Sequence, residues 1–68
     1  MINLKEVRRA VGLSQIELGR RANVSRYRIS LAESGAILLR SDEAEAIRQV
    51  LLPELEKTTR YVIDLVAR

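Results

Sequence analysis

The sequence predicts an all-α fold, a compact bundle of four to five short helices formed by a single domain over residues 1–68. Three observations favour this fold class. Apolar residues make up 47% of the 68 residues while Phe and Trp are absent, so the core has to be built from Leu, Ile, Val and Ala. Apolar side chains recur at helical spacing along the chain. Finally, Asn or Ser stands before several of these runs, where helix N-caps are found.

The first predicted helix begins after Asn3, which forms a capping-box pattern with Glu6. Gly12 ends the helix in the manner of a C′ glycine. At 100° per residue Arg8 falls on the same face as the apolar positions, and an Arg on a buried face requires a partner. Those apolar positions are Leu4, Val7 and Val11.

The next two predicted helices are joined by a tight turn. Ser14 caps the second helix, again with a Glu three residues later at Glu17. Asn23 takes the turn, because Asn tolerates the left-handed conformation better than most residues. Ser25 caps the third helix and Gly35 closes it. The inward-facing positions expected in the second helix are Ile16, Leu18 and Ala22.

The third helix starts with two cations, Arg26 and Arg28, at the positive pole of the helix dipole. Each costs roughly 0.3–1 kcal/mol there. The fourth helix obeys the dipole rule, with Ser41 as its cap and Asp42 and Glu43 in its first turn. A local rule broken without visible compensation is expected at a functional site. A polyanion bound to the third helix would neutralise the two cations at its start.

Two further segments have alternative interpretations. Pro53 suits the first turn of a fifth helix over residues 53–67, while residues 36–40 form an apolar run where a loop should be polar. Each segment could close the core or contact a second copy of the chain. For the fifth helix the sequence favours core closure against the first helix, and for the loop both remain open. The candidate dimer contacts are Ile37, Leu38, Leu39, Val62 and Val66.

The charge distribution is uneven. Residues 1–40 hold eight Lys and Arg against three Glu, a net charge of +5, whereas residues 41–68 have a net charge of −2. Ten of the twelve cations are Arg, which suits bidentate contacts with phosphate and guanine. An Arg-rich soluble surface without such a role is the alternative.

Residues 3–51 resemble the helix-turn-helix domain of the lambda-repressor and Cro type, also named the xenobiotic-response-element family. The residues that carry the resemblance are Gly12-Leu13-Ser14-Gln15, Glu17-Leu18, Val24-Ser25, Ile29-Ser30, Glu33 and Gly35. The resemblance implies a DNA-binding bundle that usually acts as a dimer. The function expected is a sequence-specific transcriptional regulator that binds an inverted-repeat operator in double-stranded DNA as a homodimer.

Each candidate DNA contact is expected near the third helix. Its exposed face would read base edges in the major groove through Arg26, Tyr27, Ser30 and Leu31. The candidate phosphate contacts are Gln15, Ser25, Arg28 and Arg40. Alternatively, Leu31 is an isolated surface leucine without a base contact, and Gln15 is an ordinary exposed helix residue without a phosphate contact. The resemblance further implies a structural ion pair between Arg8 and Glu33.

The chain departs from the family pattern in several places. Gly19 stands where the family prefers Ala, at a cost of about 1 kcal/mol in helix propensity. Ala32 replaces a larger apolar residue, which would leave a gap that one of Ile37, Leu38 or Leu39 could fill. The loop lacks the basic residues common in the family, so Arg40 is its one candidate phosphate contact.

Catalysis has little support in the sequence. His and Cys are absent, so the commonest general bases, thiol nucleophiles and zinc ligands are missing. We therefore expect a non-enzymatic protein with no cofactor, no metal and no small-molecule ligand. The sequence shows no membrane-span run and no secretory apolar region, so the expected location is the cytoplasm, without a membrane partner.

Two other function classes compete with the regulator. One is a protein-interaction module of the same fold, such as the partner-binding half of a toxin–antitoxin pair. The other is nonspecific nucleoid or RNA binding, for which Tyr27 offers little stacking surface. On the regulator hypothesis Arg28→Ala should flatten the salt dependence of DNA binding by about one ion, while Arg26→Ala should relax specificity at one base position.

Overall fold

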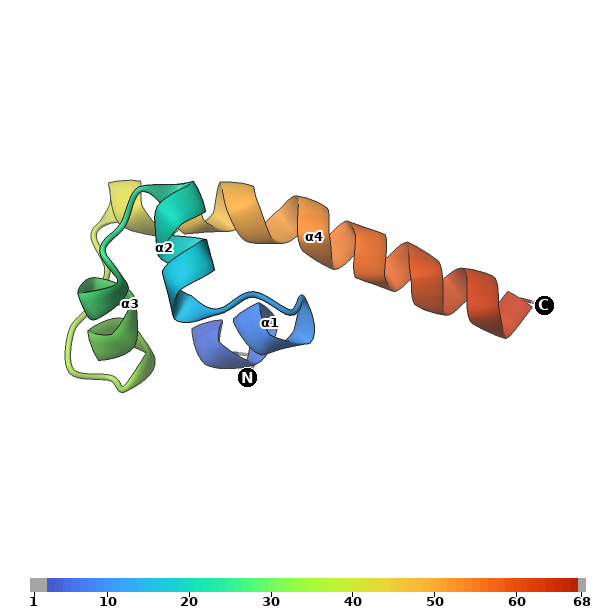
Figure 1. The fold of residues 1–68 in the computed structure, drawn as a ribbon, viewed down its shortest axis with the longest axis horizontal. Coiled ribbons are helices and arrows are strands. Elements are labelled where there is room, and N and C mark those ends of the chain that lie inside the picture. Colours follow the sequence, from blue (N-terminus) through green and yellow to red (C-terminus); the bar gives the residue numbers. More distant parts are fainter. Residues whose placement is uncertain (1–2, 68) are drawn as a thin grey trace.

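Four helices and no strand make up residues 3–67, the part of the chain that a computed structural model describes (Figure 1). The predicted all-α fold of four to five helices is therefore confirmed, and the number of helices is four. The helices are α1 (Leu4–Ala10), α2 (Gln15–Ala22), α3 (Arg26–Glu33) and α4 (Ser41–Ala67).

The three predicted N-caps of α1, α2 and α3 all form. In each, a side-chain oxygen accepts a hydrogen bond from the backbone N–H three residues later, which satisfies a donor that the helix leaves free. The bonds are Glu6 N–H to Asn3 Oδ1 at 2.9 Å, Glu17 N–H to Ser14 Oγ at 3.0 Å and Arg28 N–H to Ser25 Oγ at 3.2 Å. The turn residue Asn23 adopts the expected left-handed conformation, with φ 56° and ψ 41°.

The start of α4 differs from the prediction. Ser41 is the first helical residue rather than the cap. The carbonyl of Arg40 accepts the first helical hydrogen bond, from Ala44 N–H at 2.9 Å. The carboxylate of Glu43 accepts the backbone N–H of Arg40 at 2.9 Å. This is one half of a capping box, in which the carboxylate three residues into the helix satisfies the N–H of the cap residue.

The predicted fifth helix is wrong as a separate element. α4 continues through Pro53 without a break. Pro has no N–H, so the carbonyl of Gln49 loses its helical donor. The helix persists because its first half is anchored in the core by Ile47 and Leu51, which are 4% and 7% exposed.

The core is small and purely aliphatic. It lies where α2 contacts both α3 and α4, and α1 also contacts α4. The buried members are Leu18, Ala22, Val24, Ile29, Ile47 and Leu51. Ile16, predicted to face inward, is 62% exposed. The loop contributes Leu39, which packs against the core, whereas Leu38 is 94% exposed.

The second half of α4 leaves the globule. Figure 1 shows it projecting past α1 as a free helical arm, and the described residues extend over 43 × 22 × 19 Å. The core contains no residue after Leu51 among those described. The prediction that residues 53–67 pack on the first helix is therefore wrong beyond Leu55, since an unbroken helix carries Val62 and Val66 into solvent at 51% and 82% exposure.

Candidate nucleic-acid interface

The exposed face of α3 brings together three of the four predicted base-reading residues. Ile29 is the one fully buried side chain of this helix and anchors it in the core. On the outer side Arg26, Tyr27 and Ser30 are all exposed and line one shallow hollow. The short helix therefore presents a cation, a phenol and a hydroxyl side by side.

Leu31, the fourth predicted base contact, is only partly accessible. The sequence placed it on the exposed face, but it is half-buried. Its residual surface offers an apolar contact smaller than the one expected for a thymine methyl group.

The half-buried Arg28 is paired with Glu43. The guanidinium Nε lies 2.5 Å from Glu43 Oε2 and Nη2 lies 2.8 Å from Oε1, a bidentate pair between α3 and α4. The carboxylate is 6% exposed and the guanidinium side chain 37% exposed. The hydrogen bonds from Arg28 and from the Arg40 N–H outweigh desolvation and lower the pKa of Glu43 to about 2.

This pair corrects the dipole argument made from the sequence. The anion that compensates Arg28 at the start of α3 lies in the chain itself, in the first turn of α4. The sequence contained a usable signal, because Glu43 stands four residues before Ile47 and so shares its inward face. Arg26 differs from Arg28, since it has no ion pair among residues 3–67.

The ion pair between Arg8 and Glu33 forms as the resemblance implied. Nε to Oε2 is 2.6 Å and Nη2 to Oε1 is 3.0 Å, while Nη1 donates to the carbonyl of Leu13 at 2.8 Å. The two side chains are 10% and 4% exposed. The Arg8 hydrogen bond is the main cause of a lowered pKa at Glu33, and Gln15 adds to it.

Gln15 belongs to the same buried cluster. Its side-chain amide donates to Glu33 Oε1 at 3.0 Å, a contact that sequence spacing did not indicate. The remaining amide hydrogen and the free N–H groups at the start of α2 are the donors left for a phosphate. Ser25 is similar, because its oxygen caps α3 while its O–H stays available.

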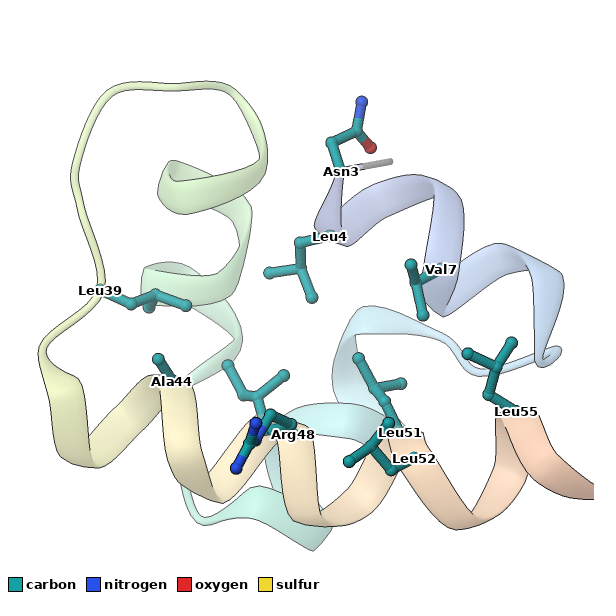
Figure 2. Close-up of a pocket in the computed structure, with 10 residues that line it drawn as sticks. Asn3, Leu4, Val7, Leu39, Ala44, Arg48, Leu51, Leu52 and Leu55 are labelled. Carbon is teal, nitrogen blue, oxygen red and sulfur yellow. The ribbon is translucent and has the colours of Figure 1, made fainter. Parts of the chain in front are cut away.

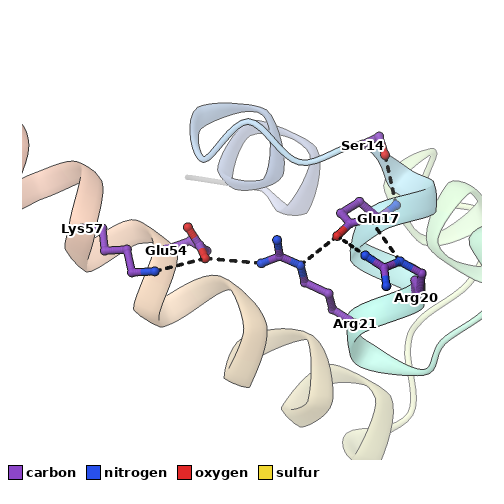
Figure 3. Close-up of polar contacts among 6 residues, drawn as sticks. All are labelled: Ser14, Glu17, Arg20, Arg21, Glu54 and Lys57. Atoms are coloured by element: carbon purple, nitrogen blue, oxygen red, sulfur yellow. Dashed lines mark hydrogen bonds and ion pairs between the residues drawn. The ribbon is translucent and has the colours of Figure 1, made fainter.

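Most other cations of the basic half also have carboxylate partners. Figure 3 shows Arg21 between Glu17 and Glu54, at 3.0 and 3.3 Å, which ties α2 to α4. Arg20 contacts Glu17 at 2.6 Å, and this contact is the largest cause of the lowered pKa of that carboxylate. Arg40, the predicted loop contact, lies 3.2 Å from Asp42 and is 69% exposed. Within residues 3–40 the cations without an ion pair to a described residue are Lys5, Arg9 and Arg26.

The acidic residues offer no metal centre in the described part of the chain. No group of three potential ligands comes together there. Within residues 3–67, no helix has both the length and the apolar character needed to cross a bilayer.

Comparisons with models of known protein families, with curated proteins and with solved structures found no match to this chain. Function therefore has to be inferred from the geometry and charge of the surface, above all from the exposed face of α3.

Proposed function

We propose that the chain is a sequence-specific double-stranded DNA-binding protein that regulates transcription, with α3 in the major groove. The observation that carries the proposal is the exposed trio of Arg26, Tyr27 and Ser30 on one face of α3. Arg26 is a cation at the positive pole of a helix, and no carboxylate among the described residues neutralises it. A major groove about 12 Å wide admits a helix of this kind.

The residues have distinct roles in the proposed complex. Arg26 donates two hydrogen bonds to O6 and N7 of a guanine, the commonest specific contact in the major groove. Tyr27 and Ser30 supply hydroxyl groups for base edges, and Leu31 supplies a partial contact for a thymine methyl. The phosphate contacts come from Ser25, Gln15 and Arg40, which position α3 without reading sequence.

Arg28 has a different role from the one its position in the sequence indicated. Because Glu43 accepts hydrogen bonds from Nε and Nη2 of its guanidinium, we assign Arg28 to holding α3 against α4 rather than to a phosphate contact. The recognition helix is then rigidly mounted, which specific base contacts require.

In the proposed complex, the protein binds an inverted repeat as a homodimer. Two copies of α3 about 34 Å apart would reach successive major grooves on one side of the duplex. Occupancy of such an operator regulates the adjacent promoter by blocking polymerase or by recruiting it.

The first test is selection from a random duplex library at near-physiological salt. We expect enrichment of an inverted repeat with half-sites about one turn apart. Arg26→Ala should relax one base position in each half-site and cost about 1–3 kcal/mol. Lys57→Ala is the matched control, because it removes the same charge from the far arm of α4, and it should leave the selected sequence unchanged.

Two other outcomes would reject this proposal. A folded protein that enriches no sequence and binds no duplex favours the protein-interaction module, for which the exposed apolar residues of α4 are the supporting observation. Comparable affinity for every duplex would indicate nonspecific nucleic-acid binding instead.

A further inference from the structure

An apolar groove runs between α1 and the first half of α4. Its volume is about 340 Å³, and pockets for small molecules begin at about 300 Å³. Figure 2 shows Leu4 and Val7 of α1 on one side of the groove and Leu51, Leu52 and Leu55 of α4 on the other. The groove shares no residue with the hollow on the exposed face of α3, so it is a separate surface.

The dimensions of the groove fit one extended aliphatic chain. Its α4 wall reaches from Ala44 to Leu55 on an unbroken helix, which spans roughly 16 Å at about 1.5 Å per residue. A volume of about 340 Å³ over that length gives a mean cross-section of about 20 Å². An extended aliphatic chain needs about 15–20 Å², because its carbon atoms keep about 4 Å from their neighbours. A helix with its side chains is about 10–12 Å in diameter, at least about four times that section, so it does not fit inside the groove.

The groove carries one charged side chain among the described residues that line it. This is Arg48, whose side chain is 64% exposed. Its Nε lies 3.2 Å from Glu45, in an ion pair whose two side chains are both exposed to solvent. Such a pair contributes little to stability, so the guanidinium can take a ligand carboxylate instead. An aliphatic wall with a single cation is complementary to an aliphatic chain that ends in an anion.

We propose that the groove binds a medium-chain fatty acid, with the carboxylate on Arg48 and the tail along Leu51, Leu52 and Leu55. From position 48 to position 55 the helix rises about 10 Å. An extended chain advances about 1.2 Å per bond, so about nine carbon–carbon bonds fit over that distance, as in decanoate. The sequence predicted no small-molecule ligand, because the groove exists only where α1 folds beside α4. This inference goes beyond the proposed function and does not depend on it.

The first measurement is a titration of the full chain with decanoate, followed by NMR of the methyl groups. We expect saturable binding with a dissociation constant between about 0.1 and 1 mM. The methyl signals that change should be those of the Leu and Val residues of the groove. Each CH₂ group removed from the acid should weaken binding about four-fold. Decyltrimethylammonium, which has the same tail and a positive head group, should bind at least about five-fold more weakly than decanoate.

Three results of this titration would overturn the proposal. They are binding that does not saturate, changes confined to residues 62–66 of the α4 arm, and equal affinity for the cationic amphiphile. Binding of the chain to phospholipid vesicles without binding of monomeric decanoate would also overturn it, because the ligand would then be a membrane surface.

A substitution at Arg48 tests the contact with the head group. Arg48→Gln should weaken decanoate binding about three- to five-fold and should leave the binding of decanol, which has no charge, unchanged. Arg60→Gln removes the same charge from a part of α4 outside the groove and is the matched control. An Arg48→Gln chain that binds decanoate as tightly as the parent would show that this cation does not hold the carboxylate.

A substitution at Leu52 tests the apolar wall. Leu52→Asp should weaken the binding of both decanoate and decanol at least about ten-fold. Leu65→Asp is the control, because Leu65 lies on the same helix with a similar exposure, 53% against 46% for Leu52, but does not line the groove. Neither residue belongs to the core, so the circular dichroism spectra should match the parent. Equal binding by Leu52→Asp and the parent would overturn the proposed site.

The two proposals fail separately. A chain that selects an inverted repeat and binds no fatty acid would keep the DNA-binding proposal and lose the groove ligand. A chain that binds decanoate in the groove and selects no duplex would do the reverse.

Discussion

Arg28 of α3 and Glu43 of α4 form a bidentate ion pair that fixes the exposed helix to the longest helix of the fold. The same carboxylate accepts the backbone N–H of Arg40 and so also caps α4. One side chain therefore orders the start of two helices and neutralises a cation at an unfavourable helix pole. Any change at Glu43 should affect both helices together.

Glu43 should make the stability of the protein depend on acid pH. Its pKa is lowered to about 2 in the folded chain, against about 4.3 for a free Glu. The unfolded state binds the proton first as pH falls, so the stabilisation is complete above about pH 4.3 and is lost down to about pH 2. In Glu43→Gln, urea unfolding midpoints should fall less steeply across this window than in the parent protein. Equal slopes would show that the pair contributes no pH dependence.

Substitutions of Arg28 and of Arg26 should have different effects on stability and on DNA binding. Since Arg28 is paired with Glu43, Arg28→Ala should lower the free energy of unfolding. It should leave the salt dependence of DNA binding nearly unchanged, contrary to the expectation from sequence alone. Arg26→Ala should leave stability within about 0.5 kcal/mol, as for most surface substitutions, and should weaken binding. The measurement is the dependence of the dissociation constant on salt, checked against urea unfolding. If the salt dependence of binding instead falls by about one ion in Arg28→Ala, Arg28 contacts a phosphate.

The local features of the fold were predictable from sequence because they depend on neighbouring residues. The caps at Asn3, Ser14 and Ser25 and the left-handed Asn23 follow from side-chain chemistry within three positions. The pairing of Arg8 with Glu33 spans 25 residues, and a family resemblance was needed to anticipate it.

The features that sequence reasoning missed depend on tertiary packing. Pro53 is typical of a helix start. The helix nevertheless continues through Pro53, because Ile47 and Leu51 anchor the preceding turns in the core. Arg28 looks unpaired until α4 folds beside α3 and brings Glu43 within 2.5 Å. Ile16 satisfies the helical period but lies on the outer side of a core too small to cover every apolar residue.

Removal of one partner of the buried Arg8–Glu33 pair should lower the free energy of unfolding strongly. Replacement of both partners by apolar residues should lower it much less. Arg8→Ala leaves a carboxylate that is 4% exposed without its cation, which typically costs about 3–5 kcal/mol. The double substitution Arg8→Met with Glu33→Leu removes both charges and should recover most of that loss. Urea unfolding of the single and double variants measures both effects. A double variant no more stable than Arg8→Ala would show that the loss does not come from an uncompensated charge.

Gly19→Ala should destabilise the protein although Ala is the better helix former by about 1 kcal/mol. A Cβ atom at this position would lie 2.5 Å from the carbonyl oxygen of Val24, so α2 or the turn has to shift. We expect a net loss of about 1–3 kcal/mol, as for other overpacked sites. Thr58→Ala, on the exposed arm of α4, is the control and should be neutral or slightly stabilising in thermal unfolding. A Gly19→Ala variant as stable as the parent would show that the turn accommodates the methyl group.

Pro53→Ala should stabilise α4. The substitution restores an N–H that can donate to the carbonyl of Gln49, and it removes a residue that costs about 3 kcal/mol in a helix interior. The gain in unfolding free energy should lie below that figure, because the unfolded chain also becomes more flexible without the proline ring. Urea unfolding monitored by circular dichroism at 222 nm measures it. A loss of helicity would instead mean that the proline fixes a bend on which the packing of Leu51 and Leu55 beside α1 depends.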